Sequence, residues 1–467
     1  MNAKFRNLPF YLFVAGLVLI IISPHFLSDG MFMDGIIYSA VSKNLSNGLG
    51  SFWNLHFTQT LFPEFNEHPP LAFGMQSLVY SVFGESRYVD KLYSISTCII
   101  VSLLILQIWK RLGYKQGWSV LLIFFSIPLT TWASTNNLLE NTLSIFICLS
   151  ILFYVISRSS SKRYLYLSLS GIMLSLGFLT KGFVAFFPWV LPFIYWVVVR
   201  QNSVWNPLKE TLVMILSTLI PLGILFTLSE EARISIINYT DSQVVNSLRN
   251  VQTVDSRFFI LKKIFLDLTP AVVIGLLLLL WSRIKKIPSK QIIPDYRLAL
   301  VFFLLALSGV VPIMISMKQR LFYVIATTPA FAISIGILIN PLVEQISLRL
   351  KNSVVFRWAS YVLLVVGLSL SLYFSNKIGR EENKIKDMYV IGNKIPQGSI
   401  INISPDLWGN WSLHAYYSRH YNISLDKKTE NRHPFLLTTK ENQEKIDISA
   451  YTEINLPTVE YVLYTLN

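Results

Sequence analysis

Residues 301–340, VFFLLALSGVVPIMISMKQRLFYVIATTPAFAISIGILIN, consist of two apolar runs with the short polar turn SMKQR between them. The second run, 321–340, is long enough to cross the hydrocarbon core of a bilayer, about 30 Å thick, as a helix, and the first is long enough when it is extended back to residue 298. Because the turn is so short, the second helix must return beside the first, with Lys318 and Arg320 at the membrane surface. Cations at an outer turn are unusual and favour an anionic partner. This stretch predicts a helical protein that crosses the membrane repeatedly.

The composition extends this prediction to the whole chain. Hydrophobic residues make up 53% of the 467 residues and charged residues only 14%, whereas soluble domains carry about 25% charged residues. We therefore predict an all-α polytopic membrane protein with about eleven transmembrane helices and a small C-terminal α/β soluble domain. The expected spans are residues 9–27, 88–109, 117–134, 140–157, 164–180, 183–199, 210–229, 270–284, 298–316, 321–340 and 357–374.

Basic residues on the connections predict the orientation of the chain. Cytoplasmic loops of membrane proteins carry an excess of Lys and Arg. Here the cations gather at alternate connections: Lys4 and Arg6, and then residues 110–115, 158–163, 200–209, 283–297 and 349–357. This pattern predicts a cytoplasmic N-terminus. Since the number of spans is odd, the C-terminus is expected outside.

Three regions face outward in this topology: residues 28–87, residues 230–269 and the tail. We expect a transmembrane domain over residues 1–375 and a soluble domain over residues 376–467. In the tail, SIINIS (399–404) and YVLYTL (461–466) have strand character around a helical stretch at 407–420, which predicts a small α/β domain. The sequence shows no nucleic-acid motif, so we expect no nucleic-acid partner.

The first outward region contains MFMDGIIYSAVSKNLSNGLG (31–50), in which apolar residues recur at helical spacing after Asp34. This pattern predicts an amphipathic helix that lies on the outer membrane surface. Two interpretations of Asp34 remain open. It could cap the helix, since Asp is a favoured N-cap, or it could be a catalytic carboxylate.

FNEHPPLAF (65–73) follows in the same region. Two consecutive prolines stiffen the chain and extend the residue before them, so Glu67 and His68 are presented on a rigid segment at the membrane edge. The structural alternative is a rigid turn into the apolar stretch 71–83, which is too short to span.

Two more ionisable residues map to the same outer face. Glu140 opens the fourth span, and Asn137 before it gives a pattern like a capping box. Lys181 ends the fifth span before Gly182, where a cation could instead offset the helix dipole. With Asp34, the Glu67–His68 corner and the Lys318/Arg320 turn, five polar features meet at one face, which favours a site over independent caps.

A metal site is a second possibility in the first outward region. His56, Glu64, Glu67 and His68 offer imidazole and carboxylate ligands close together in sequence. Their spacing matches no defined metal motif. A divalent metal therefore stays open, although the chemistry below does not require one.

Taken in order, MFMDGIIYSA, EHPPL, LLENTL, GFLTKG and a late outer Lys/Arg turn resemble the integral-membrane GT-C glycosyltransferases. The resemblance covers residues 1 to about 340 and is to enzymes similar to the protein O-mannosyltransferases and the aminoarabinose transferase of lipid A. It implies that Asp34 and Glu140 are catalytic acids and that the proline corner touches the donor phosphate. Relatives often carry Lys where this chain has His68.

The resemblance implies a glycosyl donor linked to a polyprenyl phosphate, since nucleotide sugars are absent outside the membrane. Breaking the sugar–phosphate bond adds negative charge to the phosphate, which fixed cations can stabilise. Glu67, His68, Lys181, Lys318 and Arg320 are the candidate donor-phosphate residues, and Asp34 is the candidate base for the acceptor hydroxyl, with inversion at the sugar. No cofactor is then required. The expected acceptor is a lipid, a glycan or a protein.

A transporter or flippase for a lipid-linked sugar is the alternative function. Transporters usually place ionisable residues near the midplane, often with internal repeats, and neither feature is visible in the sequence. Sequons at Asn44, Asn238, Asn402, Asn410 and Asn422 all fall on expected outer segments, and a glycan on Asn44 would crowd the proposed site. This favours a bacterial plasma membrane as the compartment.

Overall fold

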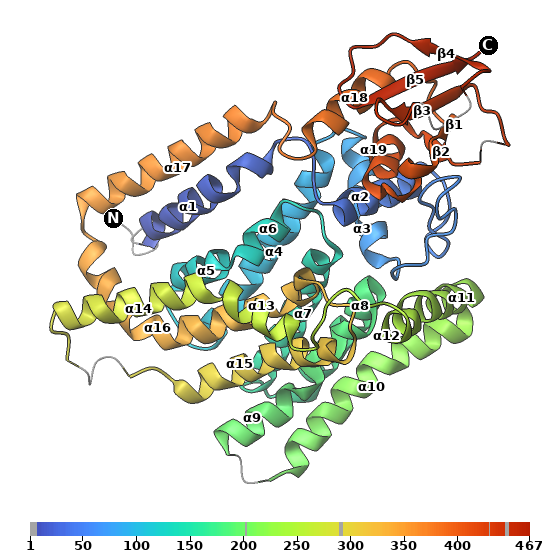
Figure 1. The fold of residues 1–467 in the computed structure, drawn as a ribbon. Coiled ribbons are helices and arrows are strands. Elements are labelled where there is room, and N and C mark those ends of the chain that lie inside the picture. Colours follow the sequence, from blue (N-terminus) through green and yellow to red (C-terminus); the bar gives the residue numbers. More distant parts are fainter. Residues whose placement is uncertain (1–6, 201–202, 289–292, 429, 444–447) are drawn as a thin grey trace.

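The computed structural model describes residues 7–200, 203–288, 293–428, 430–443 and 448–467. Long helices form the body of the molecule, and the C-terminal tail forms a mixed α/β domain at one end of them (Figure 1). We call this end the tail face and the other end the opposite face. The predicted fold class is confirmed. Three cations used in the orientation argument, Lys4, Arg6 and Lys290, lie outside the described residues.

The helices up to residue 249 are α1 (Leu8–Phe26), α2 (Met33–Ser46), α3 (Leu71–Phe83), α4 (Val89–Arg111), α5 (Gly117–Ser126), α6 (Pro128–Ser134), α7 (Leu139–Ser157), α8 (Arg163–Lys181), η2 (Gly182–Val190), α9 (Leu191–Val199), α10 (Trp205–Leu228), α11 (Glu230–Tyr239), η3 (Thr240–Val245) and α12 (Asn246–Arg249). The helices from there to the tail are α13 (Phe259–Asp267), α14 (Thr269–Ile284), α15 (Tyr296–Val310), η5 (Val311–Ile315), η6 (Leu321–Thr327), α16 (Thr328–Leu350) and α17 (Val354–Phe374).

The protein is a multi-pass membrane protein. Within the described residues, 8 helical segments are long and apolar enough to cross a membrane, or up to 10 if each of two bent pairs is one span. One of the 8, Arg163–Val199, reverses at Gly182, where φ is +78°, and brings Gly177 against Ala185. When this hairpin is counted as two crossings, the total agrees with the prediction of about eleven.

One expected span is bent, and one expectation about local structure was wrong. Residues 117–134 were expected as one span, and α5 and α6 form a bent pair over this stretch that meets at 85°, because Pro128 cannot donate the hydrogen bond that would continue α5. The stretch 33–46 was expected to lie on the membrane surface. Instead every residue of α2 from Gly35 to Asn44 is buried, since α3 and the tail helix α19 (Trp411–Tyr421) both pack along it.

The tail is built around a five-stranded mixed sheet. Its strands are β1 (Ile400–Ile403), β2 (Ser424–Asp426), β3 (Phe435–Thr439), β4 (Tyr451–Ile454) and β5 (Tyr461–Leu466), in the order β2-β1-β3-β5-β4. β1 is parallel to β2 and β3, and β5 is antiparallel to β3 and β4. Helices α18 (Glu382–Gly392) and α19 and the short η7 (Pro405–Gly409) complete the tail.

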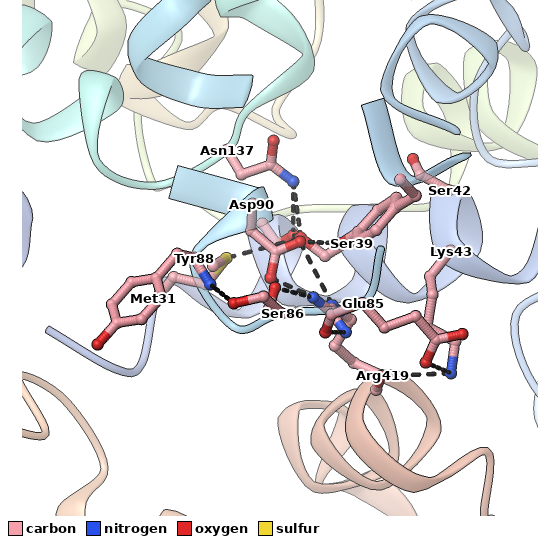
Figure 2. Close-up of polar contacts among 12 residues, drawn as sticks. Met31, Ser39, Ser42, Lys43, Glu85, Ser86, Tyr88, Asp90, Asn137 and Arg419 are labelled. Atoms are coloured by element: carbon pink, nitrogen blue, oxygen red, sulfur yellow. Dashed lines mark hydrogen bonds and ion pairs between the residues drawn. The ribbon is translucent and has the colours of Figure 1, made fainter. Parts of the chain in front are cut away.

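A buried ion pair fastens the tail to the membrane helices. Arg419 of α19 lies 3.2 Å from Asp90 of α4, and both side chains are almost fully buried (Figure 2). The other guanidinium nitrogens of Arg419 donate to the backbone carbonyls of Glu85 and Ser86, at 3.1 and 3.0 Å. Tyr80 donates a further hydrogen bond to Asp90. The buried charges of Arg419 and Asp90 are therefore both compensated by partners at this contact.

Lys43 of α2 makes the second fastening. Its Nζ donates to the carbonyls of Ser418 and Arg419, at 3.0 and 3.3 Å, and to the side chain of Asn422. These acceptors lie at the C-terminus of α19, where a helix carries partial negative charge. Burial lowers the pKa of Lys43 to about 8, although the nearby Glu85 carboxylate opposes this. The last turn of α2 is thus fixed to the tail.

We predict that Arg419→Ala strongly destabilises the protein. The substitution leaves the Asp90 carboxylate buried without its partner, which typically costs about 3–5 kcal/mol. The measurement is thermal or chemical unfolding of the purified full chain in detergent. The matched control is Arg233→Ala, because Arg233 makes an exposed ion pair with Glu230 that is worth at most about 1 kcal/mol. Equal losses in the two variants would contradict the structural role of Arg419.

Candidate active site

The centre of the candidate site is a buried ion pair at the tail face. Glu140 stands in the first turn of α7, and Lys181 is the last residue of α8. Their Oε1 and Nζ atoms are 2.5 Å apart, with side chains 0% and 7% exposed. A buried carboxylate and a buried ammonium are tolerated only as such a pair. The two helices, packed side by side, therefore deliver one neutralised pair of charges to the site.

Asp34 faces this pair from the first turn of α2. Burial raises the pKa of Asp34 to about 6, the Glu140 charge adds to this effect, and the charges of Lys181, Arg320 and Lys318 oppose it. A carboxyl group with a pKa near 6 is mostly ionised at neutral pH and is basic enough to accept a proton. Its environment therefore suits a general base.

The structural alternatives for Asp34 and Glu140 do not account for these residues. Phe32, not Asp34, occupies the N-cap position of α2, and its N–H donates to Asn136 Oδ1 at 2.8 Å. Leu138 holds that position in α7, so Asn137 and Glu140 form no capping box. Asn137 instead donates to Ser39 Oγ at 2.8 Å. The structural reading of Lys181 does hold, since Gly182 caps the end of α8.

The proline corner enters the site through His68. Its Nε2 atom lies 3.0 Å from the hydroxyl of Tyr38, which is one turn after Asp34 in α2. Burial lowers the pKa of His68 well below its usual value, and the charges of Lys181 and Lys318 act in the same direction. His68 is therefore neutral at physiological pH. The buried Nδ1 atom has no hydrogen-bond partner among the described residues.

A cavity of about 500 Å³ opens beside these residues. Its wall includes the charged or polar side chains of His68, Lys181 and Lys318, together with many apolar side chains of η2, η3 to α12, and α15 to η5. Its polar lining residues are His68, Lys181, Tyr239, Gln243, Ser247, Ser308, Ser316, Lys318 and Tyr323. A cavity with this lining suits a ligand that has an anionic head and an apolar tail.

The turn between η5 and η6 supplies the second cation of the cavity. Lys318 Nζ donates to Gln243 Oε1 and Ser247 Oγ, at 3.1 and 3.2 Å. The buried Gln319 fixes this turn, because its side chain accepts from Ile260 N at 2.9 Å and donates to two backbone carbonyls. Arg320 is exposed and does not line the cavity, although its charge acts on Asp34.

Glu67 lies outside the cavity lining, next to Lys318. Burial raises its pKa, and the Lys318 charge and a hydrogen bond with Gln243 oppose this. A carboxylate in this position balances the charge of Lys318 and holds Gln243; it does not itself offer positive charge to a phosphate. The candidate donor-phosphate residues are thus brought to one region, with different surroundings for each.

The four residues considered for a metal are not brought together. His56 is hydrogen-bonded through Nδ1 to the carbonyl of Pro63 at 2.7 Å, and Glu64 is exposed. Among the described residues, the structure contains no group of three or more His, Cys, Asp or Glu side chains placed to hold a metal ion. The structure gives no support to a metal held by this particular set.

Several residues of the site escaped the sequence analysis. Tyr38 follows Asp34 by four residues, so helical periodicity places it on the same face, but a tyrosine in a helix carries no signal by itself. No sequence pattern marked Gln243 or Ser247 as site residues either. Gln243 lies in the π-helical turn η3, a rare geometry that is frequent at functional sites. Only the folded chain brings them to Lys318.

The fold is that of the GT-C glycosyltransferases, as the resemblance implied. Two crystal structures of ArnT from Cupriavidus metallidurans superpose on it: the apo form with a TM-score of 0.70, over 99% of this chain and 98% of that one, and the form bound to undecaprenyl phosphate with a TM-score of 0.67. Both are 14% identical in sequence. The archaeal oligosaccharyltransferase AglB from Archaeoglobus fulgidus, in complex with an inhibitory peptide and a dolichol-phosphate, gives a TM-score of 0.50 over 94% of this chain and 70% of that one, at 12% identity.

Sequence comparisons point the same way. Residues 67–225 match the family of dolichyl-phosphate-mannose-protein mannosyltransferases. Undecaprenyl phosphate-alpha-4-amino-4-deoxy-L-arabinose arabinosyl transferase 1 of Proteus mirabilis is 22% identical over 211 residues, which are 44% of this chain and 36% of that protein. The corresponding transferase of Shewanella sediminis is 28% identical over 148 residues, or 29% and 27% of the two chains. These alignments span about a third of the relatives' length.

We predict that Lys318 and Arg320 differ in their contribution to ligand binding. Lys318→Ala should weaken binding of undecaprenyl phosphate about tenfold, because it removes a charge-assisted contact inside the cavity. Arg320→Ala should change it less than about threefold, since Arg320 lies outside the cavity and is screened by solvent. The measurement is the lipid's dissociation constant for the purified full chain. A larger effect of Arg320→Ala would show that the phosphate binds elsewhere.

Proposed function

We propose that this chain is a membrane glycosyltransferase that moves a sugar from a polyprenyl-phosphate-linked donor to an acceptor hydroxyl. The observation that carries the proposal is the cavity, whose wall combines Lys181 and Lys318 with many apolar side chains, and the charges of both lysines act on Asp34. The apolar side chains would hold the isoprenoid tail, and the two lysines would hold the phosphate. The relatives' names, which specify an undecaprenyl-phosphate-linked pentose, support this donor class.

Lys181 and Lys318 would stabilise the departing phosphate. When the bond between the sugar's anomeric carbon and the phosphate oxygen breaks, that oxygen keeps the electron pair and the phosphate gains one negative charge. Fixed cations already aimed at that charge need no reorganisation as it develops. Each cation has a carboxylate neighbour: Lys181 has Glu140, and Lys318 has Glu67. The position of the two ammonium groups against the phosphate, and not a net positive charge, would therefore stabilise it. We propose that no added metal is required.

The neutral His68 would add a hydrogen bond and no charge. Neutral imidazole has one donor nitrogen and one acceptor nitrogen. With Nε2 accepting from the Tyr38 hydroxyl, Nδ1–H is the donor, and this is the buried atom that lacks a partner. A phosphate oxygen of the donor would satisfy it. This explains how His68 can serve where relatives often carry Lys.

Asp34 would accept the proton of the acceptor hydroxyl as that oxygen attacks the anomeric carbon. Attack opposite the leaving phosphate inverts the configuration at that carbon. Glu140 would act through Lys181, because it holds the ammonium group in place. Of the two catalytic acids expected from the sequence, we therefore assign Glu140 a positioning role. The acceptor is a lipid, glycan or protein hydroxyl.

A transporter or flippase for a lipid-linked sugar remains the alternative function. The ionisable residues of the site lie at the tail face, at the ends of α7 and α8 and in the first turn of α2. Transfer chemistry requires a base, cations that stabilise the leaving group and a groove for the donor, all at one membrane surface. Passage across the bilayer would require a polar route through the midplane.

Asp34→Asn tests the proposal. Asparagine keeps the size and polarity of the side chain but cannot take the acceptor's proton, so transfer should slow by about 10²- to 10⁴-fold. The assay follows release of polyprenyl phosphate and mass gain of surface lipids, glycans and proteins when the purified chain is added to membranes that lack it, with and without EDTA. A well-folded Asp34→Asn protein with normal transfer would refute Asp34 as the base.

Glu140→Gln provides the comparison through pH. Asp34 must be ionised to act, so the wild-type rate should fall as the pH drops below about 6, the pKa of Asp34. Glu140→Gln removes a negative neighbour of Asp34 and leaves Lys181 without its carboxylate, so that the ionised Asp34 becomes the partner that keeps the Lys181 ammonium charged. This favours the ionised form of Asp34, so the acid limb should move to lower pH. If the acid limb of Glu140→Gln stayed at the wild-type pH, that limb would not report the ionisation of Asp34.

We propose that the tail lies outside the plasma membrane of a bacterium and the N-terminus inside. The basic residues of the opposite face support this orientation. Glu441→Cys in the tail should then react with an impermeant thiol reagent in intact cells, and Lys115→Cys only after permeabilisation, in a background where Cys98 and Cys148 are Ser. The reverse labelling pattern would invert the topology and exclude an outer active site.

A further inference from the structure

A second cavity lies at the opposite face of the molecule, remote from the tail. Its volume is about 350 Å³, and its walls come from the end of α4, the end of α7, α9 and the start of α15. In Figure 1, α9 lies at the lower edge of the molecule and the tail sheet at its upper right. This cavity therefore opens at the membrane surface opposite the candidate active site, and nothing in the proposed transfer reaction uses it.

The cavity is positively charged. Three arginines line it: Arg111, Arg158 and Arg297. Among the described residues, no ion pair involves Arg111 or Arg297, and both are exposed. The acid in the lining, Asp295, accepts a hydrogen bond from Leu298 N at 2.9 Å and caps α15. The site therefore keeps an excess of cations that a ligand could satisfy.

Arg158 is held in place by its neighbours. Its Nη1 lies 3.3 Å from Glu210, and its guanidinium stacks 4.4 Å from the ring centre of Tyr195. Glu210 also pairs with Arg163, so a single carboxylate is shared by two guanidinium groups. The planar Arg158 group is thus rigid but only partly neutralised, which suits recognition of an anion.

A buried hydroxyl points to a ligand independently of these charges. Tyr154 lines the cavity and is 2% exposed. Its oxygen lies next to the Arg158 guanidinium, which can only donate to it, and the O–H donor finds no acceptor among the described residues. Leaving such a group unpaired costs about 1–3 kcal/mol. An acceptor oxygen in the cavity would satisfy it.

The remaining walls are apolar. They include Leu191, Val199, Val301 and Phe302 of α9 and α15. Val199 is partly exposed, and the other three side chains are buried in the cavity wall. The cavity thus combines guanidinium groups and a hydroxyl donor with hydrocarbon contacts at the membrane surface. Basic pockets between transmembrane helices are suited to anionic lipid headgroups. A free phosphate would use the cations and leave the apolar wall without a partner.

We propose that this cavity binds an anionic phospholipid of the leaflet opposite the candidate active site. The lipid phosphate would accept hydrogen bonds from Arg111, Arg158, Arg297 and the Tyr154 hydroxyl, and the first part of an acyl chain would pack on the apolar wall. The bound lipid would join α4, α7, α9 and α15, of which α4, α7 and α15 extend to the tail face, where they carry Asp90, Glu140 and Ser308. The proposal concerns a second site and does not depend on the transfer reaction.

The test uses the purified full chain in detergent. Native mass spectrometry compares retention of phosphatidylglycerol and phosphatidylcholine from mixed micelles. We expect the wild type to retain phosphatidylglycerol at least tenfold more strongly, and Arg111→Gln/Arg297→Gln to lose about tenfold of that affinity. The control is Lys115→Gln/Lys285→Gln, which removes the same charge from exposed positions outside the cavity and should retain the lipid.

Tyr154→Phe separates a built site from general attraction between charges. It keeps the ring and the net charge, removes a hydroxyl whose O–H donor has no acceptor among the described residues, and should fold at least as stably as the wild type. Its phosphatidylglycerol retention should fall several-fold.

Three outcomes would overturn the proposal. The first is equal retention of the two lipids, and the second is equal loss in the control variant. The third is complete displacement of phosphatidylglycerol by an equal concentration of inorganic phosphate, which would show a free-anion site. Because the readout is lipid binding, these outcomes leave the proposed transfer activity untouched.

Discussion

The buried pair of Glu140 and Lys181 is the constraint on which the site depends. Neither charge could stay ionised alone in this environment, because removal from water costs several kcal/mol per ion. Together, at 2.5 Å, they can be buried at the adjoining ends of α7 and α8. The pair brings a permanent cation to the wall of a largely apolar cavity and a negative charge close to Asp34. The cation at the cavity wall follows from this placement, whereas the raised pKa of Asp34 comes first from burial, with the Lys181 charge opposing it and the Glu140 charge adding to it.

The second constraint is the position of α2, the helix that carries Asp34. One side of α2 packs on α3, and the tail helix α19 covers another. Lys43 joins the end of α2 to the end of α19, and Arg419 joins α19 to α4. The tail thus forms one wall of the structure that holds the candidate base, and Lys43 and Arg419 tie it to the helices. A tail without catalytic groups of its own can still be necessary for catalysis.

Much of the fold could be predicted from the sequence, because each membrane span must satisfy its own backbone hydrogen bonds and exclude charge. The apolar stretch 71–83 was expected to be too short to span, and it forms the 13-residue helix α3 with the same bounds. The burial of α2 could not be predicted. Its amphipathic pattern is weak evidence for a surface helix, and the contact that buries it comes from Arg419 and its neighbours, far away in the sequence.

The candidate site also has a part that could be predicted from the sequence and a part that could not. Asp34, Glu140 and Lys181 could be assigned to one face because topology alone fixes which helix ends meet there. Sequence could not show that Glu140 neutralises Lys181, because a pair distance depends on how two helices pack. Nor could it find Gln243, which reaches Lys318 from a π-helical turn of a segment expected only as an outward region. Both the Glu140–Lys181 pair and the Gln243–Lys318 contact depend on how the helices pack, so local sequence patterns cannot predict them.

A donor with a long apolar tail also explains why the cations can stand in such a dry site. Lys181 is almost fully buried and Lys318 is partly buried, so a phosphate that reaches them must lose hydration. Contact between the isoprenoid tail and the apolar side chains of the cavity is remote from the bond that breaks, and binding energy of this kind can offset that cost. The dry environment then strengthens the attraction between the cations and the charge that develops on the phosphate. The apolar side chains and the cations of the cavity are thus two parts of one mechanism, and neither would be sufficient without the other.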